Sequence, residues 1–418
     1  MTLALRERRA FNGRADRVLP PRPGSSDPAA QTISQRRIWA RVLAVGAISR
    51  AFFFVFGAIG HEAVRQSHVR GLYPEPLGAL SYWAHWDGRW LAHIANSGYD
   101  TDAATAFFPL YPLVLRVGVE AGFGVALIGV AISTLATLAA LYFVFAIGNA
   151  WYGERAALAA IVTLAFFPMA FYLNAVYSDP LFLALTAGSF WALYVRRQLL
   201  LAGAFAAFAA LTRNIGGLLL LPLAYEWVRN RREFGWTGLA GVAGPVAGVL
   251  AYALYLWERS GNPLLFSEAY EQNWHRSFGN PLVTLRDGFA HAHDGVSYLV
   301  PGRVLETAST LPATLLSNTL NFCFLGFACL TLILAARRVP PGVLLYAIPA
   351  ALGPLALNDA RGLPLISYPR YVLVVFPLFL ALAAVLARSR LALVAWTVAS
   401  ATVGAYLTIL FASWRWVA

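Results

Sequence analysis

Two acids and two arginines could do chemistry because each interrupts or borders an apolar stretch: Asp87, Asp179, Arg213 and Arg370. A charge near membrane depth is costly and is usually paired or functional. A carboxylate can take a proton from a hydroxyl group, and a guanidinium can hold a phosphate through two parallel hydrogen bonds. The plainer alternatives are that Asp87 only caps or solvates a helix and that Arg370 only snorkels to the membrane surface.

Aromatic residues surround Asp87. Trp83, Trp86, Trp90 and Ile94 follow a 3-4-4 spacing, which predicts one face of a single helix. A tryptophan-rich face beside polar residues is typical of a helix in the membrane interface, with Asp87 at its rim.

Further candidates for contact with a substrate are basic, acidic or aromatic residues in or beside the polar loops: His85, Trp86, Tyr99, Tyr177, Asp179, His275 and Arg276. For the aromatic residues, anchoring in the membrane belt is an equal alternative. His275 also lies in a loose group with His291, His293 and Asp294, but this spacing is not specific for a metal. We therefore predict no metal site.

The elements that must position these residues are apolar blocks. Of 418 residues, 59% are hydrophobic and only 12% are charged, so a soluble helical protein of this length would lack its polar surface. Several blocks approach the ~20 residues that cross a bilayer. The blocks are Ile38–Gly60, Val125–Ile147, Ala156–Leu173, Trp236–Trp257, Ala313–Ala335, Val343–Leu357, Val372–Ala387 and Leu391–Ala412, with Leu199–Trp227 as two short spans broken near Arg213. The sequence predicts an all-α polytopic membrane protein of about ten to twelve transmembrane helices.

The net charge of +12 is concentrated between the blocks. Arginines precede the first block and recur in the turns at 196–197, 229–232, 337–338 and 388–390. This positive-inside pattern predicts that the N-terminus and these turns are cytoplasmic, and it argues against a nucleic-acid partner.

The same alternation divides the chain into a tail and a membrane domain. Residues 1–35 are predicted to be a disordered cytoplasmic tail, and residues 36–412 the transmembrane domain. Long extracytoplasmic loops are expected at 61–122 and 258–311, and a shorter one at 358–370. Within the first loop, Phe107–Val119 is too short to cross and predicts a half-helix or re-entrant segment.

Several motifs together resemble the PIG-V family, the second mannosyltransferase of GPI-anchor assembly and its bacterial relatives. The most specific is the Phe-Phe-Pro-Leu-Tyr-Pro run of residues 107–112 after Trp86-Asp87-Gly88. Weaker matches are Gly98-Tyr99, Pro168 with Tyr177-Ser178, Leu211-Thr212-Arg213, and Arg370-Tyr371 through Phe376-Pro377. They occur in the family's order over roughly residues 80–380. One departure is Asp179, where the family would have glutamate after Tyr-Ser.

The resemblance implies a GT-C glycosyltransferase that moves a hexose, mannose in this family, from a polyprenyl-phosphate donor to an acceptor outside the cytoplasm. It implies that Asp87 is the general base. Arg370, with Arg213, is then expected to bind the donor phosphate, and inversion of the sugar is the expected outcome. No cofactor is expected, the partners are the donor, membrane lipids and an unknown glycan, glycolipid or protein acceptor, and the composition points to a bacterial plasma membrane. A transporter or flippase of lipid-linked saccharides is the alternative.

Overall fold

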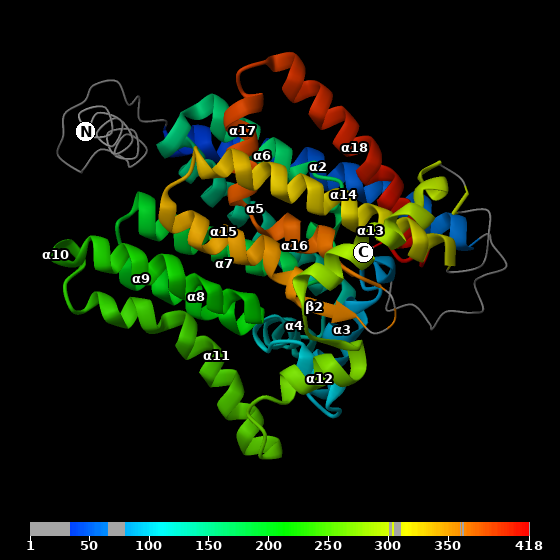
Figure 1. The fold of residues 1–418 in the computed structure, drawn as a ribbon, viewed down its shortest axis with the longest axis horizontal. Helices are drawn as coiled ribbons and strands as arrows, with labels where there is room; N and C mark the ends of the chain where they lie inside the picture. Colours follow the sequence, from blue (N-terminus) through cyan, green and yellow to red (C-terminus); the bar gives the residue numbers. More distant parts are fainter. Residues whose placement is uncertain are drawn as a thin grey trace.

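The fold is described by a computed structural model for residues 34–65, 80–300, 303–304, 311–359, 361 and 363–417. Over these residues the structure is almost entirely helical, as the apolar blocks predict (Figure 1). The predicted N-terminal tail lies almost wholly outside the described residues.

Five helices in the described part of the chain are long and apolar enough to cross a bilayer. They are α2 (Gln35–Arg65), α5 (Val125–Tyr152), α11 (Gly238–Ser260), α14 (Leu311–Ala336) and α18 (Arg390–Ala412). A sixth span arises if α16 (Tyr368–Val374) and α17 (Pro377–Leu386), which meet at 74°, cross together.

The remaining elements are shorter. The α-helices are α3 (Asp87–Ser97), α4 (Leu110–Glu120), α6 (Glu154–Ala165), α7 (Asp179–Phe190), α8 (Leu199–Thr212), α9 (Leu220–Arg229), α10 (Arg231–Phe234), α12 (Leu265–Trp274), α13 (Pro281–Asp294) and α15 (Pro341–Leu352). The 3₁₀-helices are η2 (Ser81–Trp83), η3 (Ala103–Ala106), η4 (Ala170–Leu173), η6 (Asn214–Leu219), η7 (Val296–Leu299) and η8 (Gly353–Ala356). The segment η5 (Trp191–Val195) is a π-helix. The 11-residue α4 agrees with the half-helix predicted there.

Over the described residues, five or six candidate spans are fewer than the ten to twelve that the sequence predicts, and some of the predicted apolar blocks are broken within the fold. The break predicted near Arg213 is confirmed: α8 ends at Thr212 and Arg213 is extended, with φ −154° and ψ 142°. The block Ala156–Leu173 is not one helix, because α6 ends at Ala165. Pro168 follows closely, and the residue before a proline disfavours helical backbone.

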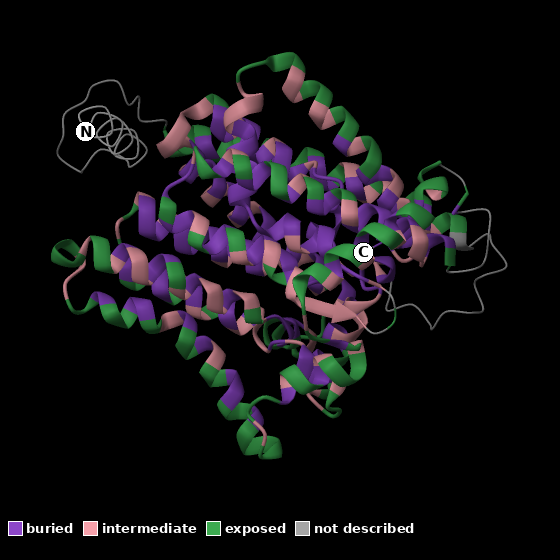
Figure 2. Ribbon diagram, viewed as in Figure 1, coloured by how far each residue is buried: buried purple, intermediate pink, exposed green. Residues whose placement is uncertain are grey.

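Close packing of short and long helices forms the buried centre of the molecule (Figure 2). Helix α5 packs against α6 and α7, and α8 lies along α11. At the α8–α11 contact, a Cβ on Gly203 would overlap the backbone of Gly241. Small residues let helices approach this closely.

Arginine-bearing segments from three parts of the chain lie close together: the start of α2, the turn after α5 and the turn after α14. Arg41 at the start of α2 lies 3.7 Å from Glu154, at the turn that follows α5. Beside it, the Tyr152 hydroxyl donates to the Arg338 carbonyl at 2.6 Å. Short α10 lies at the left edge of Figure 1, whereas α3, α12 and β2 lie away from it to the right. The start of α2 and the turns after α5 and α14 therefore lie close together.

A two-stranded sheet joins the second and third predicted outer loops. Strand β1 (Arg276–Phe278) pairs antiparallel with β2 (Leu357–Asp359), with Arg276 opposite Asp359. In the same region, α12 packs on η3 of the first loop. Segments from all three predicted outer loops thus meet in one place.

The predicted single helix through Trp83, Trp86, Trp90 and Ile94 is wrong. Trp83 lies in η2 and is fully buried. Trp86 has φ 53°, so α3 starts only at Asp87. Periodicity alone did not reveal the left-handed residue that separates the two turns. The break places Asp87 in the first turn of α3, where the positive end of the helix dipole favours a carboxylate.

Candidate active site

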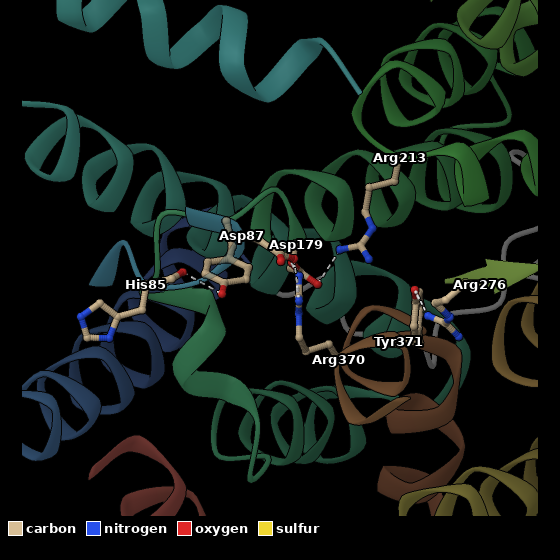
Figure 3. Close-up of polar contacts among 8 residues, drawn as sticks. His85, Asp87, Asp179, Arg213, Arg276, Arg370 and Tyr371 are labelled. Carbon is tan, nitrogen blue, oxygen red and sulfur yellow. Dashed lines mark hydrogen bonds and ion pairs between the residues drawn. The ribbon is translucent and has the colours of Figure 1, made fainter. Parts of the chain in front are cut away.

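A chain of ion pairs joins residues that are far apart in sequence. Arg370 Nη1 donates to Asp87 Oδ2 at 2.8 Å, and its Nη2 donates to Asp179 Oδ2 at 3.0 Å. Arg213 Nη1 donates to the other oxygen of Asp179 at 2.7 Å. Figure 3 shows this line of side chains from Asp87 through Arg370 and Asp179 to Arg213. All four charged residues singled out in the sequence therefore lie together.

The two carboxylates differ in burial. The Asp179 side chain has 0% exposure and accepts bonds from two arginines, whereas the Asp87 side chain is 25% exposed. Rings of Tyr172 and Tyr177 stack on the Arg370 guanidinium, at 4.9 and 4.6 Å. Asp179 is thus a buried anchor for Arg213 and Arg370, whereas Asp87 is the acid that is partly exposed.

Arg276 is a third arginine at the site, and its side chain has fewer hydrogen-bond partners than that of Arg370. The residue is 5% exposed, and its Nη1 lies 3.4 Å from the Tyr371 hydroxyl. Its Nε and Nη2 are buried and have no hydrogen-bond partner among the described residues. Figure 3 shows Arg276 beside Tyr371 and across from Arg213. Buried donors without partners are costly, which indicates a site for an acceptor group from a ligand.

A cavity of about 460 Å³ joins these residues. Asp87, Tyr177, Arg213, Arg276 and Arg370 all line it. Much of the remaining wall is apolar and comes from η6, α15, η8 and the start of β2: Ile215, Leu218, Pro349, Pro354 and Leu357. The cavity therefore combines a carboxylate and arginines with a surface that suits a hydrocarbon chain.

Five residues predicted to contact substrate are not among those that line this cavity in the described structure. One is Asp179, which instead binds Arg213 and Arg370. His85 Nδ1 lies 3.0 Å from the Phe411 carbonyl, and its ring stacks on Trp414 at 3.7 Å. Burial lowers the pKa of His85 to about 3, so the ring is neutral. In Figure 3 it points away from Asp87. Its backbone carbonyl accepts the Tyr177 hydroxyl at 3.0 Å, so its contact with the site is indirect.

The other three belong to separate contacts. Trp86 packs edge-on against Trp416 near the C-terminus. The Tyr99 hydroxyl donates to the Phe107 carbonyl at 2.8 Å. His275 is exposed and has φ 53° at the end of α12.

The sequence-based prediction missed several residues that line the cavity: Ser178, Ser267, Tyr270, Glu271 and Tyr371. Tyr371 could have been chosen because it directly follows Arg370. Ser267 and Glu271 are four apart and so share a face of α12, but nothing in the sequence shows which face turns inward.

The fold defines an all-α polytopic membrane protein with an acid- and arginine-lined cavity. Residues 67–225 match the family described as Mannosyltransferase (PIG-V). GPI mannosyltransferase 2 of Drosophila pseudoobscura pseudoobscura is 48% identical over 40 residues, which cover 10% of this chain and 9% of that protein. These matches confirm the resemblance to PIG-V mannosyltransferases.

Two solved structures, both of ArnT from Cupriavidus metallidurans, are more distantly similar. The form bound to undecaprenyl phosphate is 17% identical, with a TM-score of 0.44, over 82% of this chain and 60% of that one. The apo form is 14% identical, with a TM-score of 0.35, over 84% of this chain and 78% of that one.

Proposed function

We propose that this protein is a GT-C-type glycosyltransferase that moves a hexose, with mannose the sugar implied by the family, from a polyprenyl phosphate to an acceptor hydroxyl. One observation carries the proposal: a partly exposed carboxylate, Asp87, and an unsatisfied buried arginine, Arg276, line the same cavity. The apolar wall of that cavity supports a prenyl chain as part of the donor.

Asp87 is the proposed general base. It accepts the proton of the acceptor hydroxyl while that oxygen bonds to the anomeric carbon of the sugar. The bond from this carbon to the donor phosphate breaks, and the phosphate keeps the electron pair. A phosphate is a good leaving group, so one carboxylate suffices, unlike glycoside hydrolysis, which needs a second carboxyl group as acid. A single displacement of this kind inverts the anomeric centre.

The arginines stabilise the departing phosphate in this mechanism. Arg276 is the strongest candidate because its Nε and Nη2 have no partner among the described residues. Arg213 and Arg370 already bind Asp179, so they contribute charge through a fixed network. A phosphate near Arg370 would also compete with Asp87 for the Nη1 group. Donor binding would therefore weaken the ion pair between Arg370 and Asp87. Preorganised cations of this kind act where charge develops in the transition state.

The proposed active site faces away from the cytoplasm, in a bacterial plasma membrane. Support comes from the positive-inside pattern of the arginine-rich turns in the sequence, and from the contacts that bring the start of α2 beside the turns after α5 and α14. The orientation is tested with an Asp100→Cys variant in a chain whose Cys323 and Cys329 are replaced by alanine. A membrane-impermeant thiol reagent added to intact cells should label it, and labelling only after lysis would reverse the orientation.

The central test is sugar transfer in membranes from radiolabelled polyprenyl-phosphate-mannose. Asp87→Asn should lower the rate by about 10²–10⁴-fold, the usual contribution of a general base. The matched control is Asp100→Asn, because Asp100 is an exposed acid of the same loop that binds His93 at 2.8 Å. It should keep full activity.

Full activity of Asp87→Asn would remove Asp87 as the base. Glu271, the other acid that lines the cavity, would then be tested by Glu271→Gln. Anomer analysis of the wild-type product decides the stereochemistry, and retention of configuration would exclude the single displacement.

A further inference from the structure

Arg50 is a buried charge in the middle of α2, one of the candidate membrane spans. The residue is 4% exposed, yet no acidic side chain pairs with it in the part of the chain that the structure describes. Its guanidinium instead donates to two backbone carbonyls: Nη1 to Ala170 at 3.3 Å and Nη2 to Ala165 at 3.5 Å. A cation within a membrane span costs free energy, so a buried arginine that binds backbone carbonyls there needs an explanation.

These two carbonyls mark a break between helices. Ala165 is the last residue of α6, where helix carbonyls lack partners and carry partial negative charge. Ala170 begins the short turn η4. Residues 166–178 between α6 and α7 contain no α-helix and are largely buried. Local turns pair some backbone groups of this segment, such as Ala170 N–H with the Phe167 carbonyl, and the buried carbonyls without such a partner need donors from elsewhere.

Arg50 supplies these donors, and a residue of the broken segment binds Arg50 in turn. The Asn174 side-chain amide donates to the Arg50 carbonyl at 3.3 Å. Helix α5 also binds this segment: the Ser133 hydroxyl donates to the Ala175 carbonyl at 2.6 Å. Arg50 therefore joins α2 to the broken segment through hydrogen bonds from its charged side chain.

The far end of the segment carries the candidate active site. Tyr172 and Tyr177 stack on Arg370, and Asp179 follows at the start of α7. By contrast, Arg276 lies on β1, outside this segment. A shift of residues 166–178 would thus displace the Asp87–Arg370–Asp179 network without directly moving Arg276.

We infer that Arg50 is a positioning residue for sugar transfer: by binding the Ala165 and Ala170 carbonyls, it holds the broken segment that sets the placement of Arg370 against Asp87. This inference rests on the proposed function for its kinetic consequence. Its structural consequence, the placement of residues 166–178, is independent of that function.

The kinetic test compares Arg50→Met, Arg50→Lys and the control Arg36→Gln in purified protein. Arg36 is an exposed arginine at the start of the same helix. Arg50→Met should lower kcat per folded molecule by about 10- to 100-fold, the effect of a misplacement near 1 Å. The KM for the donor should change little, because Arg276 stays in place. Arg50→Lys, which keeps the charge and donors for a carbonyl, should recover part of kcat, and Arg36→Gln should match the wild type.

A second measurement needs no activity. Ser178 lines the cavity directly before Asp179, so Ser178→Cys, in a chain with Cys323 and Cys329 replaced by alanine, reports the segment's position through its rate of reaction with a small thiol reagent. Arg50→Met should change this rate several-fold, and Arg36→Gln should not. Where Arg50→Met does not accumulate, Arg50→Lys is judged by both measurements.

An unchanged kcat together with an unchanged labelling rate would overturn the role of Arg50. If the wild type transfers no sugar from the polyprenyl donor, the proposed function fails, and the labelling rate alone decides whether Arg50 positions the segment.

Discussion

The two ends of helix α8 carry similar ion pairs in different surroundings. At one end, Arg197 binds Glu233 through two bonds of 3.0 and 2.7 Å. At the other, Arg213 binds Asp179 at 2.7 Å. The Glu233 side chain is 50% exposed and that of Asp179 is 0% exposed. Bond length therefore does not distinguish a surface contact from a site.

Burial does distinguish them. Water screens the Arg197–Glu233 pair, and exposed pairs contribute at most about 1 kcal/mol. The Arg213–Asp179 pair is removed from water and shares its carboxylate with Arg370. Breaking such a pair leaves an uncompensated buried charge. The difference predicts that the same kind of substitution has unequal effects at the two ends of α8.

The largest effect is expected from Asp179→Ala. Removing this carboxylate leaves Arg213 and Arg370 without their shared partner, at a cost of about 3–5 kcal/mol in the free energy of unfolding. Thermal unfolding in detergent measures the change. Asp179→Asn keeps the shape and an acceptor oxygen and should lose less. An Asp179→Ala protein as stable as the wild type would contradict the role of Asp179 as an anchor.

A smaller and different effect is expected from Arg276→Gln. Loss of hydrogen bonds from a charged donor to a phosphate weakens binding by about 1.5–3 kcal/mol, which is roughly a 10- to 100-fold rise in the KM for the donor. Stability should change little, because Arg276 gives up only a 3.4 Å contact with Tyr371. The dependence of transfer rate on donor concentration is the measurement.

The control for that variant is Arg286→Gln, an arginine of the same loop whose side chain is 75% exposed. It should leave the KM unchanged. Equal KM values for Arg276→Gln and the wild type would assign the donor phosphate to other residues.

The smallest effect is expected from Glu233→Gln at the exposed end of α8. The substitution should change the free energy of unfolding by less than about 1 kcal/mol and leave transfer unaffected. Thermal unfolding at low and high salt checks it, because screening should remove most of the difference. A loss comparable to that of Asp179→Ala would show that burial is not what separates the two ends.

The local features of the site were predictable from sequence because they depend on neighbouring residues. Asp87 stands out beside tryptophans, and Arg213 interrupts an apolar block, which the fold confirms as a break between α8 and η6. His85 shows the limit of this reasoning. It lies two residues from Asp87, but it packs against Phe411 and Trp414 from the other end of the chain.

The helical membrane class, the arginine-rich turns and the identity of the acids and arginines that could act all follow from the sequence, because apolar length and charge are read over short windows. Which of these residues meet depends on tertiary packing. Asp87 and Arg370 are 283 positions apart, and Arg276 reaches the cavity through the pairing of β1 with β2. Such contacts depend on how broken helices and loops pack together, and no periodic pattern encodes that packing.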